Sequence, residues 1–245
     1  MNRVTKRIEM IFAQAVALQQ SGRLRSTIYC QGSNIYILNQ DRTVLLKFPI
    51  QGREASCFKG PVSFSANDYE SNQFLVKDGY IIFRQSHGEY QRDKSCRTPD
   101  ITGKDVIRIY KKQTTLAKKD NAVILNRDFL KCIDADLTHV EFQGRKGIFI
   151  CRQRNLYSGS IITVTKNTSK KKGLFVSKPV EDFPATGLRT LDFISLFNFA
   201  EAIQFYFSGK KIFLFENKDI KIPFTGIISR CIYDELGVDE HERRR

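Results

Sequence analysis

The residue types that most often perform chemistry are sparse in this chain of 245 residues. It has three histidines, and we expect His87 in a turn, His139 on a strand and His241 in the tail, all structural or solvated. Asp134 and Asp136 form an Asp-x-Asp pair of the kind that holds a cation in metal-dependent nucleases, but no further acidic cluster accompanies it. We therefore predict no metal site, and a nuclease that uses these two carboxylates remains an alternative.

Phosphate loops and activated nucleophiles are also missing from the sequence. It contains neither GxxxxGK[ST] nor GxGxxG, and residues 158–160 (Ser-Gly-Ser) are typical of a turn rather than a nucleophile elbow. The cysteines are scattered without a C-x-x-C pair, which favours reduced, mostly buried thiols in a cytosolic or nuclear protein. They are Cys30, Cys57, Cys96, Cys132, Cys151 and Cys231. The sequence thus predicts a protein that is not an enzyme and carries no cofactor.

Composition points instead to binding. Lys and Arg number 40 against 26 Asp and Glu, a formal net charge of +14, which favours a polyanionic partner: nucleic acid first, an anionic membrane second. Hydrophobic residues make up 41% of the chain, which is enough for a core and excludes global disorder. No apolar run reaches the length of about 18 residues that spans a membrane, and we expect no secretory signal.

The elements that must position any binding residue begin with a helix. Val4, Ile8, Ile11, Phe12 and Ala15 recur at helical spacing, and Gly22 is placed to end the helix. Strand patterns separated by turn residues follow it. They cover residues 25–30, 34–38, 43–49, 61–65, 80–85, 89–95 and 105–110, after which the polar, basic stretch 111–121 is expected to be a linker.

The same order then recurs in the second half. We predict two helices, one over 126–134 capped by Asn126 and one over 191–202 capped by Thr190. An acidic connector that contains proline is expected between the strand 174–177 and the second helix. The predicted strands are 123–125, 138–142, 147–152, 159–165, 174–177, 203–207, 211–215, 219–224 and 226–232. The fold class is therefore α+β, with two similar domains of short helices packed on antiparallel meander sheets.

This repeated unit resembles the DNA sliding-clamp family, which includes proliferating cell nuclear antigen and the phage clamps. The resemblance lies in chain length, in element order, in the basic helix and strands of residues 3–48, and in the helix and strands of 191–229. It implies a clamp-like domain over 1–110, a connector over 111–122, a second such domain over 123–238 and a charged tail over 239–245. It also implies a trimeric ring, no membrane, and double-stranded DNA and a DNA polymerase or other replication or transcription protein as partners.

Family resemblance also implies particular site residues. Clamp helices present Lys and Arg to phosphates, a contact that carries no sequence information and permits sliding. The residues expected there are Arg3, Lys6, Arg7, Arg127 and Lys131, with Arg23 and Arg25 nearby. The partner peptide would dock on the outer face, loosely at Leu116, Pro223 and Ile227.

Three binding alternatives stay open at this stage. The basic residues of the first helix are equally consistent with an ordinary solvated face. A viral or phage replication or transcription accessory protein could bind nucleic acid without encircling it, and a single-strand-binding module could stack bases on strand aromatics. The aromatics in question are Tyr36, Phe48, Phe205, Phe207, Phe213 and Phe215, whose period-two spacing favours a core instead. The expected location is the cytoplasm, or the host cytoplasm or nucleoid for a phage protein, and the nucleus for a eukaryotic one.

Overall fold

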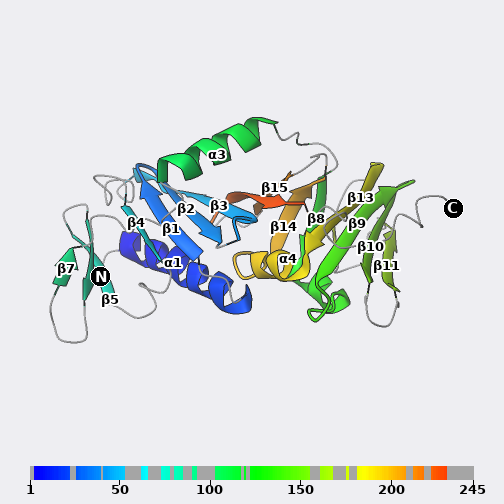
Figure 1. Cartoon of the computed structure of the whole chain (residues 1–245), viewed down its shortest axis with the longest axis horizontal. Coiled ribbons are helices and arrows are strands. Elements are labelled where there is room, and N and C mark those ends of the chain that lie inside the picture. The colour runs from blue at the N-terminus through cyan, green and yellow to red at the C-terminus, as the bar shows by residue number, and fades with distance from the viewer. Residues whose placement is uncertain are drawn as a thin grey trace.

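The computed structural model of the chain is an α+β structure of antiparallel sheets and short helices (Figure 1). It describes residues 3–22, 26–39, 41–52, 62–65, 73–77, 80–84, 90–92, 103–116, 119, 122–154, 161–167, 175–176, 181–207, 212–217 and 222–230. The fold class predicted from the sequence is confirmed.

A nine-stranded antiparallel sheet forms the centre of the molecule and joins the two halves of the chain. Its order is β12 (Phe175–Val176), β8 (Ala122–Asn126), β14 (Ala202–Tyr206), β15 (Ile212–Asn217), β16 (Thr225–Ser229), β3 (Val44–Pro49), β2 (Asn34–Asn39), β1 (Ser26–Gln31) and β4 (Val62–Ser65). The halves meet where β16 pairs with β3, from Thr225 opposite Lys47 to Ile228 opposite Val44. Gly226 lies in this seam, and a Cβ there would overlap the ring of Phe215, so only glycine fits without displacement.

Two smaller antiparallel sheets contain the other strands that the structure describes. One has the order β11 (Ile161–Asn167), β10 (Ile148–Arg154), β9 (His139–Arg145) and β13 (Phe183–Arg189). The other has the order β5 (Gln73–Lys77), β6 (Tyr80–Arg84) and β7 (Tyr90–Arg92). The strands expected in these regions are confirmed. Two further strands were not expected: β5, and β13, which occupies part of the predicted acidic connector.

Helices cover both faces of the nine-stranded sheet (Figure 1). On one face α1 (Arg3–Gly22) packs against α4 (Thr190–Leu196), with the 3-10 helix η2 (Arg127–Cys132) near α4. On the opposite face lies α3 (Gly103–Leu116). We call the solvent-exposed side of α1 and α4 the α1–α4 surface, and the side of the sheet under α3 the outer face.

Alternating side chains divide the core into two clusters, one on each face of the sheet. Ile35 and Ile37 of β2 join the cluster under α1 and α4, whereas Tyr36 between them joins the cluster under α3. The first cluster continues into the four-stranded sheet through Phe142 and Phe149. The sheet is therefore buried on both faces at β2 and β3, and this explains why apolar side chains lie on both sides of these two strands.

The extended structure predicted over 105–110, and the first part of the predicted linker, are wrong. Residues 103–116 form α3, in which Val106 and Tyr110 are buried one helical turn apart. A short apolar run cannot by itself distinguish a strand from one side of a helix. The polar residues after Tyr110 continue that helix to Leu116.

The predicted helix over 191–202 is too long. It begins one residue earlier and ends at Leu196, because Phe197, Asn198 and Phe199 donate backbone hydrogen bonds to carbonyls three residues back. This tight turn brings Phe199 beside Phe48, with ring centroids 5.8 Å apart. The predicted cap Thr190 belongs to the first turn, and Arg189 takes the cap position.

Two further local predictions need correction. The segment expected to be helical over 126–134 is a six-residue 3-10 helix, and Asn126 makes no side-chain capping hydrogen bond. Residues 222–224 of the strand predicted over 219–224 are not in a strand, and 218–221 lie outside the described residues. The side chain of Asn217 closes this loop, since its Nδ2 donates to the carbonyl of Ile222 at 2.7 Å and its Oδ1 accepts from the amide of Phe224 at 2.9 Å.

Candidate nucleic-acid interface

The α1–α4 surface is where the sequence placed a contact with phosphates. Helical spacing buries Ile8, Ile11 and Phe12 of α1 and leaves Lys6 and Met10 exposed on the opposite side. Lys6 therefore offers an ammonium group to solvent from this surface.

Arg7 is held more closely to the fold. Its side chain is half-buried, and Nη2 donates to the carbonyl of Pro49 at 3.2 Å, at the end of β3. Arg7 therefore ties α1 to the sheet. The side chain of Arg3, and all of Arg23 and Arg25, lie outside the described residues.

Arg127 connects η2 to the end of α4. Its Nε and Nη2 donate to the carbonyl of Phe197 at 3.2 and 2.6 Å, and its Nη1 lies 2.6 Å from a carboxylate oxygen of Glu201. The Phe197 carbonyl is one that the end of α4 leaves unpaired, and a cation is favourable at such a helix end. Arg127 thus has a structural role that its position in the sequence did not reveal.

Lys131 is exposed but paired within its own helix. Its Nζ lies 2.8 Å from Oδ1 of Asp128, three residues earlier, and this hydrogen bond raises the pKa of Lys131. The two basic residues predicted for DNA binding in the second half therefore each carry a neighbouring carboxylate. Among the described residues predicted for this surface, Lys6 is the exposed cation that forms no ion pair with another described residue.

Asp134 and Asp136 do not assemble a metal site. Oδ1 of Asp134 accepts the amide of Asp136 at 3.0 Å, so this carboxylate closes its own turn. No group of three or more His, Cys, Asp or Glu side chains within the described ranges could hold a metal ion. The pair offers no support for a nuclease.

A buried carboxylate that the sequence analysis missed joins the two halves beside α4. Asp192 is 2% exposed, and its oxygens accept hydrogen bonds from Oγ1 of Thr43 at 2.6 Å and from Nδ2 of Asn39 at 3.3 Å. Oδ1 of Asn39 in turn accepts the amides of Thr43 and Val44, both at 2.9 Å. Asp192 thereby anchors α4 to the turn between β2 and β3, about 150 residues away in the sequence.

Charged neighbours surround this carboxylate on its solvent side. Arg189 of β13 forms an ion pair with Asp41 and lies 4.0 Å from Oδ2 of Asp192. Burial raises the pKa of Asp192, while the hydrogen bond from Thr43 and the charge of Arg189 oppose that rise and Asp41 adds to it. Burial and Arg189 together lower the pKa of the nearby His139.

The raised pKa of Asp192 predicts a specific pH dependence of stability. The extra stability that comes from protonating Asp192 is fully present below the unfolded-state pKa of about 3.9 and is lost as pH rises through the higher folded-state value. The hydrogen bonds from Thr43 and Asn39 to the ionised carboxylate remain above that pH. Lowering the pH through this window should therefore stabilise the wild type relative to Asp192→Asn, which cannot titrate. Urea unfolding of both proteins across the acidic range measures this difference. A difference that stays constant or moves the opposite way contradicts the prediction.

The outer face is occupied by the chain's own helix. Ile227 is buried together with Tyr36, Leu45, Val106 and Tyr110. The rings of Tyr36 and Tyr110 lie edge to face at 5.8 Å, and the Tyr110 hydroxyl hydrogen-bonds that of Thr225. Nζ of Lys47 lies 5.5 Å from the centre of the Tyr110 ring. These contacts hold α3 on the sheet.

This arrangement bears on the predicted partner-peptide site, which stays a prediction. Ile227 lies in the cluster beneath α3, so it is not accessible to another protein in this structure. Pro223 is exposed, and the side chain of Leu116 lies outside the described residues. The helical spacing of Val106 and Tyr110 is the feature of the sequence that could have indicated a helix packed over Ile227.

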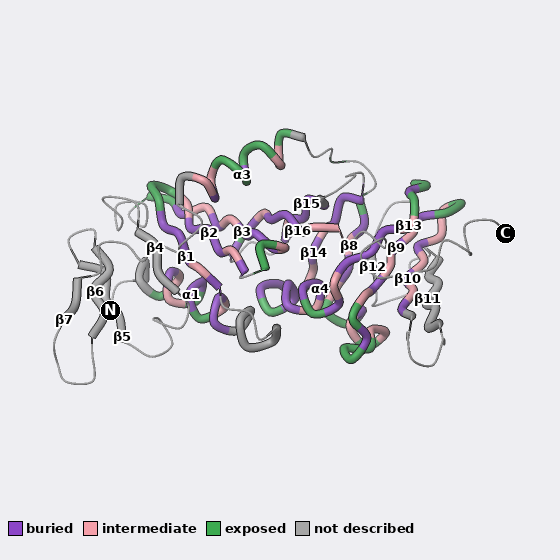
Figure 2. Tube along the Cα trace, viewed as in Figure 1, coloured by how far each residue is buried: buried purple, intermediate pink, exposed green. Residues whose placement is uncertain are grey.

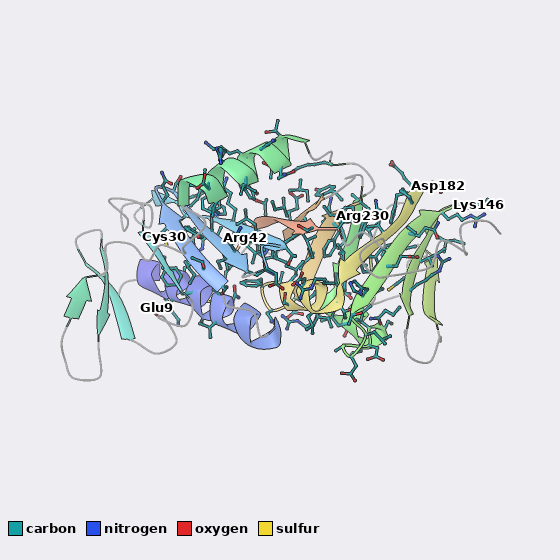
Figure 3. All side chains as sticks on the ribbon, viewed as in Figure 1. Glu9, Cys30, Arg42, Lys146, Asp182 and Arg230 are labelled. Atoms are coloured by element: carbon teal, nitrogen blue, oxygen red, sulfur yellow. The ribbon has the colours of Figure 1, made fainter. Side chains whose placement is uncertain are left out.

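The strand aromatics are core residues, as their period predicted, and do not form a stacking platform for bases. All six are at most 3% exposed, and they are Tyr36, Phe48, Phe205, Phe207, Phe213 and Phe215. Cys30 and Cys151 are buried, and burial raises the pKa of both thiols. Figure 3 labels Cys30 on the sheet beside α1. Cys132 is partly exposed, and Cys57, Cys96, Cys231, His87 and His241 lie outside the described residues.

No described helix is both long and apolar enough to cross a membrane. No protein-family model matches the chain, and no curated protein matches it in sequence.

Solved structures do share its fold. Proliferating cellular nuclear antigen from Entamoeba histolytica superimposes with a TM-score of 0.50 and 12% identity, over 91% of this chain and 96% of that one. The beta clamp of Helicobacter pylori, solved in complex with 3,4-difluorobenzamide, superimposes with a TM-score of 0.59 and 10% identity, over 92% of this chain. The match spans 64% of the length of that clamp chain. The fold of this chain is therefore that of the sliding clamps.

Proposed function

We propose that this chain is a processivity factor of the sliding-clamp type, which holds duplex DNA without sequence preference, tethers a polymerase or another replication or transcription protein, and performs no chemistry itself. The observation that carries the proposal is the clamp fold, with α1 and α4 packed side by side on one face of a continuous sheet. Fold alone does not define function, so the residues of the α1–α4 surface must support the proposal.

Electrostatics supports a non-specific contact with DNA. The chain has a net charge of +14, which attracts phosphates over long range, and Lys6 presents its ammonium from α1. A lysine contact to the DNA backbone carries no sequence information, as sliding requires. The contact with DNA is expected to lie mainly on α1, because Lys6 makes no ion pair with any described residue, whereas Arg127 and Lys131 are paired with carboxylates.

Replacing Lys6 by glutamate tests the DNA contact. The variant should bind a labelled duplex about three- to tenfold more weakly, and the slope of log K against log salt should fall by about one. Lys112→Glu provides a matched control, since it makes the same charge change on the exposed side of α3, across the sheet. Fluorescence anisotropy over a range of salt measures both quantities. Equal losses in the two variants would leave only the net charge as an explanation and would remove Lys6 from the site.

Assembly decides between the two forms of this proposal. A trimeric ring would grip DNA topologically, and it is the arrangement expected from the sequence resemblance. Light scattering at low and high salt measures the mass of the assembly, and retention on circular but not linear DNA tests encirclement. A monomer that dissociates equally from circular and linear DNA would favour the second candidate. This candidate is a viral or phage accessory protein that binds nucleic acid through an open face. The sparse unpaired charge of the described α1–α4 surface favours that candidate. The expected location is the cytoplasm, a host cell's cytoplasm or nucleoid, or a nucleus, depending on the source.

A further inference from the structure

The helix α3 has one apolar and one basic side. Val106 and Tyr110 are buried against the outer face, whereas Arg108, Ile109, Lys111 and Lys112 are exposed. Figure 2 shows this exposed side turned away from the sheet along the length of the helix. A helix whose apolar side is already buried in this way presents a preformed charged surface to solvent.

Because α3 covers the outer face, the surface accessible to another protein there is that of α3. Tyr36, Leu45 and Ile227 are at most 5% exposed beneath α3. A partner arriving from this side therefore contacts α3 itself rather than the sheet. Ile227, one residue of the predicted peptide site, lies beneath this helix and not on its solvent side.

The solvent side of α3 combines positive charge with an apolar side chain. Asp105 pairs with Arg108 at 3.0 Å, while Lys111 and Lys112 make no ion pair with any described residue. Ile109 is 39% exposed and is one of three large hydrophobic residues exposed in the described part of the chain, with Met10 and Leu191. Phosphates could neutralise the two lysines but would leave Ile109 in contact with water. An acidic polypeptide that also carries an apolar side chain can satisfy both features.

We infer that the exposed side of α3, formed by Arg108, Ile109, Lys111 and Lys112, binds an acidic segment of a partner protein that carries an apolar residue among its carboxylates. The inference rests on the proposed function in one respect: this surface would be where the chain tethers its polymerase or other partner protein. Carboxylates pair with Lys111 and Lys112 and accelerate association, and the apolar residue covers Ile109. Pairing in solvent is weak and sensitive to salt, so the interaction is expected to be reversible.

The experiment uses the full chain and a fluorescein-labelled synthetic peptide of alternating Glu and Asp around one central leucine. Anisotropy titrations compare the wild type with Lys111→Glu/Lys112→Glu and with the control Lys6→Glu/Arg145→Glu, which reverses the same number of exposed charges away from α3. The α3 variant should lose about tenfold or more in affinity for the peptide, and the control should stay within about twofold. Ile109→Ser should weaken binding about threefold, and the same loss should follow when serine replaces the leucine of the peptide.

Duplex DNA titrated against the same variants identifies the other outcomes. Equal losses of peptide binding in both double variants would overturn the inference, because net charge alone would explain them. A greater loss of DNA binding than of peptide binding in the α3 variant would also overturn it, by making α3 a nucleic-acid surface. If Ile109→Ser bound the peptide as tightly as the wild type, the inferred contact between Ile109 and an apolar residue of the partner would be wrong. Circular dichroism confirms that each variant is folded. Because the peptide titration contains no DNA, the measured peptide affinities can be interpreted even if the chain does not bind DNA.

Discussion

Replacing Asp192 by alanine is expected to lower the free energy of unfolding by about 2–4 kcal/mol. Hydrogen bonds to a charged group contribute about 1.5–3 kcal/mol each, and a buried donor left without an acceptor costs about 1–3 kcal/mol. The substitution leaves Oγ1 of Thr43 and Nδ2 of Asn39 without the carboxylate that accepts from them. Removing the desolvated charge offsets part of the loss, which is why the figure is smaller than the sum of the two bonds. Urea denaturation at neutral pH measures the effect.

A double-mutant cycle with Thr43→Val separates the hydrogen bond from general disruption. The two substitutions should couple by about 1 kcal/mol or more, because each removes one partner of the same contact. Leu191→Ala is a matched control in the same helix turn, since Leu191 is exposed and should change stability by less than about 0.5 kcal/mol. Additive effects of Asp192→Ala and Thr43→Val would show that the 2.6 Å contact does not anchor α4.

Replacing Phe142 by alanine is expected to destabilise the second half by about 3–5 kcal/mol, the usual range for removing a buried aromatic ring. Phe142 is fully buried, with its ring centroid 5.0 Å from that of Phe193 and 5.5 Å from those of Phe149 and Phe207. It therefore joins β9 to α4 and to the nine-stranded sheet. Chemical denaturation followed by circular dichroism measures the loss.

A conservative substitution and a hydrogen-exchange measurement make the prediction for Phe142 specific. Phe142→Leu retains most of the volume and should lose about half as much stability or less. Because α4 packs on Phe142 through Phe193, the alanine variant should also open earlier at α4 in hydrogen exchange than at α1. A loss below about 1 kcal/mol for Phe142→Ala would mean that the aromatic cluster can collapse around the cavity.

Only part of the candidate site was accessible to sequence reasoning. The basic residues of α1 were located correctly on a helix, because the spacing of Ile8, Ile11 and Phe12 defines its buried side and leaves Lys6 exposed. The same reasoning gave no warning that Arg127 donates to the carbonyl of Phe197, 70 residues away, or that Asp192 accepts from Thr43. Partners so distant in the chain leave no periodic signature.

The failures of the element predictions have a common origin. The residues of α3 contain a short apolar run that fits both a strand and a helix, and the sheet beneath decides between them by offering Tyr36 and Ile227 to one helical side. The early end of α4 is likewise set by tertiary packing, since the turn after it places Phe199 against Phe48 and Phe224. In both places local propensity is weaker than the gain from burying aromatic and apolar surface.

The sequence by itself determined the α+β class, the long first helix, most strands, the phenylalanine core and the strong positive charge. These features follow from local periodicity and composition, which each segment carries alone. Tertiary structure alone decided that β16 pairs with β3 to make one sheet from both halves, that α3 covers the outer face, and that Arg127 and Lys131 face carboxylates. The reason is that strand pairing, burial and ion pairing depend on which distant segments meet, and that choice is made by the packing of the whole chain.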